Sequence, residues 1–319
     1  MNNASFALRR LPDKARFHVI KSLDYVQLVS FSFISTKSKL LVKSFSVPMD
    51  FLEVTFDGQL SISLFPPGRR EIQFNLYENQ EMGEPPKHLN VVSDRITIDW
   101  QECWKNLGLS FNAIFQHLLS LFRVGKITLT IDNETEDLDT ADFRSLISEW
   151  SWIKIVNASD TYVQKLSDTL IPLTKYVFLE MPEFAEEIFQ VFPQKLGIQN
   201  LDYLNLDSKY RLTLDDALAM NSRRFRIHQL STKETNRFFK SWIKGSNPRM
   251  KESYVVLKEE EVNQEMLLKG LKCQVMPEEL ERRVNECNVI IGGFDVRNKL
   301  GKLATIKIRA NTVDFIVWD

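Results

Sequence analysis

The stretch FRIHQLSTKETNRFFKSWIKGSNPRMKESYVVL, residues 225–257, contains a strand-like run, a helix-like run and a second strand-like run. A serine or threonine at 231–232 can cap the helix, and Gly245 can end it. The apolar stripe of this helix consists of Phe238, Phe239, Trp242 and Ile243. One strand and one helix cannot bury an apolar face alone, so the stretch predicts one unit of a larger array.

The same alternation of strand and helix extends over much of the chain after residue 125. The strand-like runs are Ile127–Ile131, Trp152–Val156, Tyr176–Met181, Tyr203–Leu206, Phe225–Leu230 and Tyr254–Leu257. The helix-like segments lie at 141–150, 161–170, 183–192, 214–220 and 232–243. Successive strands begin 22–29 residues apart, a spacing typical of leucine-rich-repeat solenoids. We expect an irregular leucine-rich-repeat-like domain over 125–319, because the regular leucine and asparagine consensus is missing. A doubly wound parallel sheet is the alternative.

Residues 49–124 predict a β-rich connecting region that ends in a helix. Asp57 and Gly58 separate two alternating runs, which is the pattern of a β-hairpin. The expected strands are 51–56, 61–65, 71–76 and 95–100, followed by an apolar helix at 109–122. At the far end of the chain, the runs 304–308 and 313–318 predict a hairpin that caps the last edge of the array. The expected fold class is therefore α+β or α/β.

Residues 4–48 predict a small unit of three helices. Apolar residues recur every three or four positions between Leu8 and Val26, Pro12 suits a helix start, and Asp24 can cap a second helix. A unit of this size buries little apolar surface and would be marginal alone. Residues 1–45 hold eight basic side chains against two acidic ones, a net charge of +6, whereas the whole chain has −1. This basic start predicts an acidic partner.

Motifs for catalysis, cofactors or metals are missing from the sequence. We find no glycine-rich phosphate loop and no nucleophile elbow, and the four histidines are isolated. Cys103, Cys273 and Cys287 lie too far apart for a zinc site or a disulfide framework. We therefore expect a non-catalytic protein without a cofactor. The near-neutral charge predicts no nucleic-acid or membrane partner. The lack of a signal peptide or long apolar run predicts a cytoplasmic and/or nuclear location.

Two segments resemble a known combination of domains. Residues 11–44, LPDKARFHVIKSLDYVQLVSFSFISTKSKLLVKS, resemble an F-box. Residues 212–250, LTLDDALAMNSRRFRIHQLSTKETNRFFKSWIKGSNPRM, resemble the F-box-associated type 2 domain of nematode F-box proteins. The most specific parts of this second segment are Asn221-Ser222, Leu230-Ser231, Asn236-Arg237-Phe238 and 242–248. We place the F-box at 4–48 and the associated region at about 195–262.

The resemblance implies a function in ubiquitin transfer. An F-box packs on a Skp-type adaptor that sits on a cullin scaffold, and the remaining chain holds a target protein near the conjugating enzyme. The residues that the resemblance places against the adaptor are Leu11, Pro12, Val19, Ile20, Leu23 and Leu28. The basic start suits an acidic adaptor tail, mainly by speeding encounter. The chain itself would perform no bond chemistry, and its target is unknown.

Two other functions stay open at this point. The first is a leucine-rich-repeat-like protein-binding scaffold without ligase function, in which the N-terminal helices only cap the array. The second is an α/β enzyme with an unrecognised site. A deep pocket with convergent polar groups would favour the enzyme.

Overall fold

The computed structural model describes residues 11–68, 71–76, 86–95, 98–106, 108–132, 152–157, 160–180, 190–191, 194–284 and 289–318. The chain divides into two compact units, which we call unit 1, up to Ile127, and unit 2, from Thr128 onward. The division falls inside strand β6 (Arg123–Asp132). The finer domain limits at 48/49 and 124/125 stay predictions.

Unit 1 begins with the expected helices. These are α1 (Asp13–Ser22), α2 (Tyr25–Phe33) and α3 (Thr36–Lys43). Helix α2 starts with a capping box, in which the Asp24 carboxylate accepts from the Gln27 backbone N–H at 2.8 Å and the Gln27 side chain accepts from the Asp24 N–H at 3.1 Å. Residues 4–10 of the expected helical unit lie outside the described residues.

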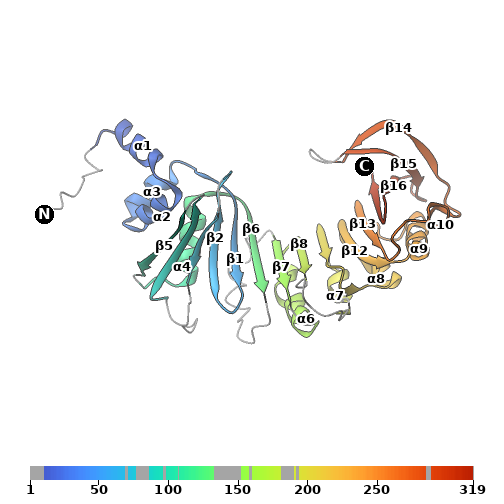
Figure 1. Cartoon of the computed structure of the whole chain (residues 1–319), viewed down its shortest axis with the longest axis horizontal. Helices are drawn as coiled ribbons and strands as arrows, with labels where there is room; N and C mark the ends of the chain where they lie inside the picture. Colours follow the sequence, from blue (N-terminus) through green and yellow to red (C-terminus); the bar gives the residue numbers. More distant parts are fainter. Residues whose placement is uncertain are drawn as a thin grey trace. The chain divides into compact units, whose positions relative to one another are not determined.

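A meander of antiparallel strands follows the helices (Figure 1). The strands are β1 (Pro48–Phe56), β2 (Leu60–Phe65), β3 (Ile72–Asn75), β4 (His88–Arg95) and β5 (Ile98–Lys105). The predicted hairpin at Gly58 is confirmed, and the glycine has a φ of 88°, which a side chain rarely adopts. The single strand predicted at 95–100 is wrong, because Arg95 ends β4 and pairs with Ile98 of β5. An alternating run looks alike in two successive strands, so the pattern did not show where one ends and the next begins.

Helix α4 (Phe111–Leu121) joins the N-terminal helices to the rest of unit 1. Its residues Ile114, Phe115 and Leu118 are fully buried. The ring of His117 stacks on Phe33 of α2 with 4.1 Å between centroids. The small helical unit therefore completes part of its core with the following domain, as its size predicts.

Unit 2 contains parallel strands in chain order. They are β6, β7 (Trp152–Val156), β8 (Tyr176–Glu180), β10 (Tyr203–Leu206), β12 (Arg224–Leu230) and β13 (Glu252–Leu257). Between and after them lie α6 (Asp160–Thr169), η3 (Ile171–Leu173), α7 (Gln194–Gly197), α8 (Leu214–Ala219), α9 (Thr232–Ile243) and α10 (Gln264–Leu268). All six predicted strand runs are thus present. Two short strands, β9 (Gln190–Val191) and β11 (Tyr210–Arg211), pair separately.

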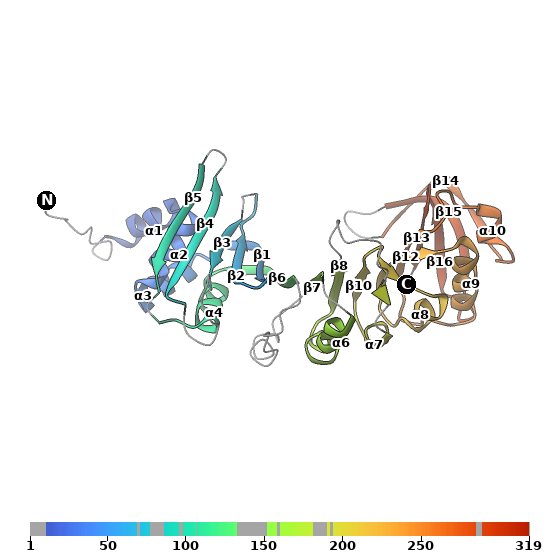
Figure 2. The same ribbon diagram turned by 60° about the horizontal axis from the view of Figure 1, so that its bottom comes forward.

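The helices α6, α7, α8 and α9 lie along one side of these strands (Figures 1 and 2). Burial follows this arrangement, since Ile153, Val177 and Leu204 are fully buried while their neighbours Trp152, Tyr176 and Tyr203 are half-buried. The strand order does not reverse within the described part, so the switch point of a doubly wound sheet is absent there. The leucine-rich-repeat assignment itself stays a prediction.

Two expected helices of unit 2 fall largely outside the described residues. The helix predicted at 141–150 lies wholly outside them. Of the helix predicted at 183–192, only residues 190–191 are described, and they form strand β9, so that end of the prediction is wrong.

Antiparallel strands complete unit 2. They are β14 (Gln274–Arg283), β15 (Val289–Arg297), β16 (Leu303–Ile308) and β17 (Thr312–Val317), in the order β13-β17-β16-β15-β14. The predicted hairpin is confirmed as β16 and β17, and β17 covers the edge of β13. It is not the final cap, because β14 continues the sheet and forms the outer strand. Strand β14 was not predicted, because its many charged residues leave no apolar run in the sequence.

Candidate binding surfaces

The six residues that the F-box resemblance placed against an adaptor have different surroundings. Ile20 is 1% exposed and Leu28 is 6% exposed, so both side chains belong to the core of unit 1. Pro12, at the start of α1, is exposed. The remaining three, Leu11, Val19 and Leu23, are half-buried. A partner can reach these four residues and not the buried pair.

Three apolar side chains of the same helical region, two in helices and Ile34 just after α2, are more exposed than any of the six except Pro12. Phe17 is 49% exposed, Leu40 60% and Ile34 71%. The ring of Phe17 stacks on Phe45, with 4.7 Å between centroids. Helical periodicity marks these positions as apolar but does not show that they face outward. Large apolar side chains in such exposed positions indicate a surface for a partner.

The motif around α9, which is the most specific part of the second resemblance, builds the frame of unit 2. The Asn236 amide donates to the carbonyl oxygens of Leu267, at 2.6 Å, and Lys269, at 3.1 Å, at the end of α10. The Asn247 amide donates to the carbonyl oxygens of Ala217, at 3.1 Å, and Met220, at 2.8 Å, at the end of α8. These contacts satisfy helix-end carbonyls and clamp three helices together.

The apolar stripe of α9 is equally structural. Phe238, Phe239 and Trp242 are buried. Phe239 and Trp242 pack on Phe315 of β17, with ring centroids 4.6 and 4.9 Å apart. The Ser231–Glu234 capping box fixes the start of the helix. The buried letters of the motif are therefore used in packing, whereas Arg237 and Lys244 are exposed.

The opposite side of the parallel strands, which we call the open face, carries a different set of side chains. Strand register brings them into two rows across the sheet. One row is Trp152, Tyr176, Tyr203, Arg224 and Glu252, and the other is Lys154, Phe178, Asn205, Arg226 and Tyr254. All ten are half-buried. Sequence reasoning missed this surface because its members come from five segments far apart in the chain.

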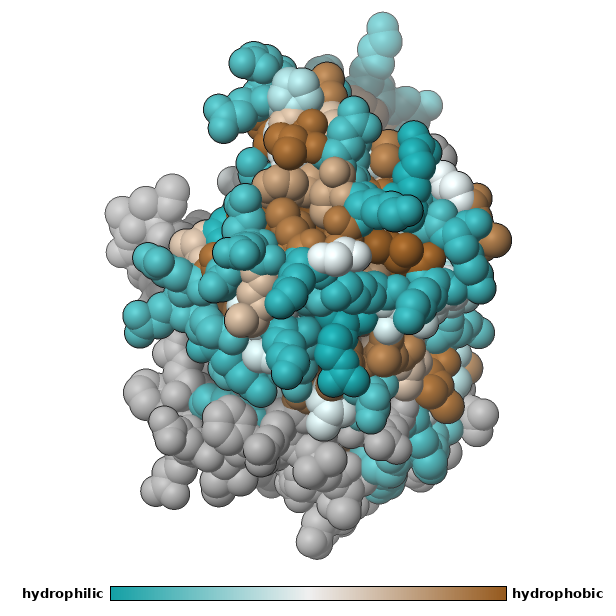
Figure 3. Space-filling model, turned by 90° about the vertical axis from the view of Figure 1, so that its right-hand side faces the viewer, coloured by the Kyte–Doolittle hydropathy of each residue, from teal (hydrophilic) through white to brown (hydrophobic). Residues whose placement is uncertain are grey.

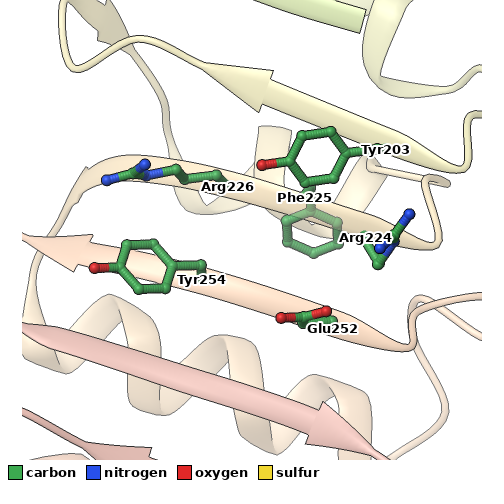
Figure 4. Close-up of a pocket in the computed structure, with 6 residues that line it drawn as sticks. All are labelled: Tyr203, Arg224, Phe225, Arg226, Glu252 and Tyr254. Carbon is green, nitrogen blue, oxygen red and sulfur yellow. The ribbon is translucent and has the colours of Figure 1, made fainter. Parts of the chain in front are cut away.

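A pocket of about 340 Å³ lies on the open face. It is lined by Tyr203, Arg224, Phe225, Arg226, Glu252 and Tyr254 (Figure 4). The guanidinium carbon of Arg226 lies 4.7 Å from the ring centroid of Tyr254, and that of Arg224 lies 5.6 Å from the ring of Tyr203. Both arginines are thus held by cation–π contacts.

Electrostatics distinguish this pocket from its surroundings. Burial raises the pKa of the Glu252 carboxyl, against the opposing effect of Arg224. Burial, together with the positive charge of Arg226, lowers the pKa of His228 to about 4. Within the described residues, neither arginine of the pocket makes an ion pair. The two arginines together with Glu252 give the pocket a net positive charge.

A second apolar surface lies on the C-terminal strands. Val275 and Leu280 of β14 and Val289 and Ile291 of β15 are 40–71% exposed. Figure 3 views the molecule from the side where Figure 1 places these strands, and hydrophobic patches lie there among hydrophilic side chains.

Two other kinds of site are not found where the chain is described. No helix there is long and apolar enough to cross a membrane. No group of three or more histidine, cysteine, aspartate or glutamate side chains in those ranges is arranged to hold a metal ion.

Comparison with known proteins supports both resemblances. Residues 8–49 match the F-box domain family, and residues 192–255 match the F-box associated family. The chain is 42% identical over 69 residues to the F-box associated domain-containing protein sdz-33 of Caenorhabditis elegans, a match that covers 20% of this chain and 23% of that protein. No solved structure matches significantly. The chain thus carries an F-box domain near its start and, in its second unit, an F-box associated domain homologous to that of a nematode protein.

Proposed function

We propose that the chain is the substrate-recognition adaptor of an SCF-type cullin ubiquitin ligase. Its F-box would dock on a Skp-type adaptor and thereby on the cullin scaffold, while unit 2 would hold a target protein. F-box and F-box associated domains are typical of non-catalytic adaptors. The gain is the effective concentration of target near the conjugating enzyme. We place this activity in the cytoplasm and/or nucleus.

One observation carries the docking half of this proposal. Phe17, Ile34 and Leu40 expose 49–71% of their surface on a helical domain that matches the F-box family. Exposed apolar side chains of this size favour burial against a partner, at roughly 25 cal/mol per Å² removed from water. The half-buried Leu11, Val19 and Leu23 and the exposed Pro12 would extend the same contact, whereas Ile20 and Leu28 would support it from the core.

Capture of the full-length chain by a Skp-type adaptor tests the proposal. Leu11→Asp and Leu23→Asp place a charge at half-buried positions, so we expect adaptor capture to fall by at least about tenfold. Leu300→Asp is the matched control, because Leu300 is 69% exposed in unit 2. Thermal melts of all three variants establish that they fold.

The result also separates the alternatives. If the folded wild type is not captured by the adaptor, the ligase role fails and the protein is better described as a binding scaffold. If the control loses capture as strongly as the two variants, the contact does not lie on the F-box.

A further inference from the structure

We propose that the pocket between β10, β12 and β13 binds the carboxylate of an aspartate or glutamate in an extended segment of a target protein. This inference rests on the proposed function for the identity of its ligand as part of a target. The pocket of about 340 Å³ has the volume of a small ligand site and accommodates one or two side chains.

The first argument is the unmet hydrogen-bonding capacity of Arg226. Its Nε is buried and has no hydrogen-bond partner. A buried donor without an acceptor is costly, more so when it belongs to a charged group. A guanidinium presents its N–H groups in a planar fork that matches the two oxygens of a carboxylate. A ligand carboxylate would pair with the terminal N–H groups of this guanidinium, because the buried Nε itself is shielded from a ligand.

The second argument is that the neighbouring charges are already engaged. Lys154 pairs with Glu180 at 2.8 Å, and Asp314 pairs with Arg309 at 2.9 Å. The charged groups left in the pocket are Arg224, Arg226 and Glu252, whose net charge is positive. The pocket thus complements a negative ligand.

The third argument is the preorganisation of the site. Each arginine lies against a tyrosine ring, which restricts its rotamers before a ligand arrives. Figure 4 shows the hydroxyl groups of Tyr203 and Tyr254 pointing in the same direction as the Arg226 guanidinium. A hydroxyl at that end of the pocket can donate to an anion held by Arg226.

Glu252 makes a carboxylate a better ligand than a phosphate. Its carboxyl lines the same pocket. A phosphate monoester would bring close to two negative charges next to this group, whereas a carboxylate brings one. Like charges at such short range repel, so the pocket favours the monoanion.

The surface next to the pocket indicates that the carboxylate belongs to a polypeptide. Trp152 stacks on Tyr176 and Phe178 with ring centroids 4.6 and 4.9 Å apart, and Phe178 lies 5.3 Å from Tyr203, which lines the pocket. This half-buried aromatic platform continues the open face over β7 and β8. Apolar side chains that flank the acidic residue in a peptide would pack there.

Three fluorescein-labelled peptide pools provide the probe. The pools share degenerate flanking positions and differ only at the central residue, which is glutamate, glutamine or phosphoserine. Anisotropy titrations use the full-length chain and its variants Arg226→Gln, Arg224→Gln and Arg297→Gln. Arg297 is the matched control, because it is an exposed arginine at the end of β15.

We expect the glutamate pool to bind at least about tenfold more tightly than the glutamine pool, the worth of a hydrogen bond to a charged group. Arg226→Gln should remove this difference, and Arg297→Gln should leave it unchanged. Added salt should weaken binding of the glutamate pool. If Arg226→Gln does not fold, Arg224→Gln provides the same comparison.

Other outcomes overturn the inference. Equal binding of the glutamate and glutamine pools would show that the pocket does not read charge. Tighter binding of the phosphoserine pool would assign it to phosphate. Adaptor capture, measured on the same preparations, keeps the two proposals apart. Loss of capture with the glutamate preference intact refutes the ligase role alone, whereas capture without the preference refutes the pocket.

Discussion

Single amide side chains carry much of the architecture of unit 2. Asn236 lies in the first half of α9 and Asn247 lies just after its end, and they reach the final carbonyl groups of α10 and α8. Asn247 also has a φ of 49°, in the left-handed region that asparagine tolerates better than most residues. These two asparagines of the F-box-associated motif are therefore explained by their hydrogen bonds to backbone carbonyls rather than by contact with a ligand.

Asn247→Ala tests this assignment. The substitution leaves helix-end carbonyls without their donor and strains the left-handed backbone, so we expect unfolding free energy to fall by about 2–3 kcal/mol. Asn311→Ala, at an exposed turn, is the control and should change it by less than about 0.5 kcal/mol. Urea titration followed by tryptophan fluorescence measures both. Equal effects of the two substitutions would contradict the clamp.

A second residue-scale prediction concerns His117. Burial, together with Lys39, lowers its folded pKa to about 4, while the unfolded value is about 6.5. Ser32 donates its only hydroxyl proton to the Val29 carbonyl, at 2.6 Å, so its contact with His117 Nε2, at 2.7 Å, is one in which Nε2 donates. The folded state therefore holds the histidine neutral.

The sign of the pH dependence follows from these two pKa values. Between pH 6.5 and pH 4 the unfolded chain binds a proton that the folded chain does not, so this stabilisation is present above pH 6.5 and is lost as pH falls toward 4. We expect the Tm of His117→Gln to fall less between pH 7 and pH 5 than that of the wild type. His228, with a similarly lowered pKa, leaves a residual slope in the variant. Parallel slopes would exclude His117 as a source.

Among the elements, β14 combines firm attachment with an exposed edge. Arg282 contacts both carboxylate oxygens of Asp295 on β15 at 2.9 Å, and it also donates to Thr305 on β16 at 3.1 Å. The strand register shifts between Met276 and Glu281, which marks an irregularity in the pairing. The proline and the charged side chains along β14 make its free edge a poor template for another chain.

Removing these features should promote self-association. We expect the double substitution Pro277→Val and Glu279→Val to shift the protein toward larger species, because it restores a donor and removes a charge from the edge. Size-exclusion chromatography at increasing concentration measures the change. Glu260→Val, at the exposed bend after β13, is the charge-matched control and should remain like the wild type.

The elements differ in how far their sequence determined them. β7 and β10 start and end where the short alternating runs do, because the two faces of each strand differ in polarity. β14 was missed because only Met276 in it is buried, so it has no apolar period to read. The F-box helices were predicted. Periodicity alone, however, could not show that an apolar residue such as Ile20 is buried inside unit 1 whereas another, Leu40, is exposed.

For the molecule as a whole, the sequence predicted a basic helical start joined to a strand–helix array, and both are present. The open-face pocket was beyond such reasoning, because residues 203, 224–226 and 252–254 meet only through strand register. One signal was available in the sequence. Arginine and histidine alternate with apolar residues at 224–228, which is unusual for a strand whose outward face has no function.

The two proposed contacts should be energetically independent. We expect Leu23→Asp to impair only adaptor capture and Arg226→Gln to impair only binding of the glutamate pool. The double variant should show the same loss in each assay as the corresponding single variant, because the sites share no residue. Capture and anisotropy on the same four preparations measure this. A coupling free energy above about 0.5 kcal/mol would indicate communication between the units.

The alternation of inward and outward side chains along β10, β12 and β13 has a consequence for how such chains diversify. Inward residues such as Leu204, Phe225 and Val255 are locked by the helices, whereas outward ones such as Tyr203, Arg226 and Tyr254 have no such constraint. Substitution of the outward residues, which are every second residue of these three strands, can therefore change which target is bound. The inward residues between them preserve the fold. Relatives should accordingly be compared separately at the inward positions, which report shared ancestry of the fold, and at the outward positions, which report the target that is bound.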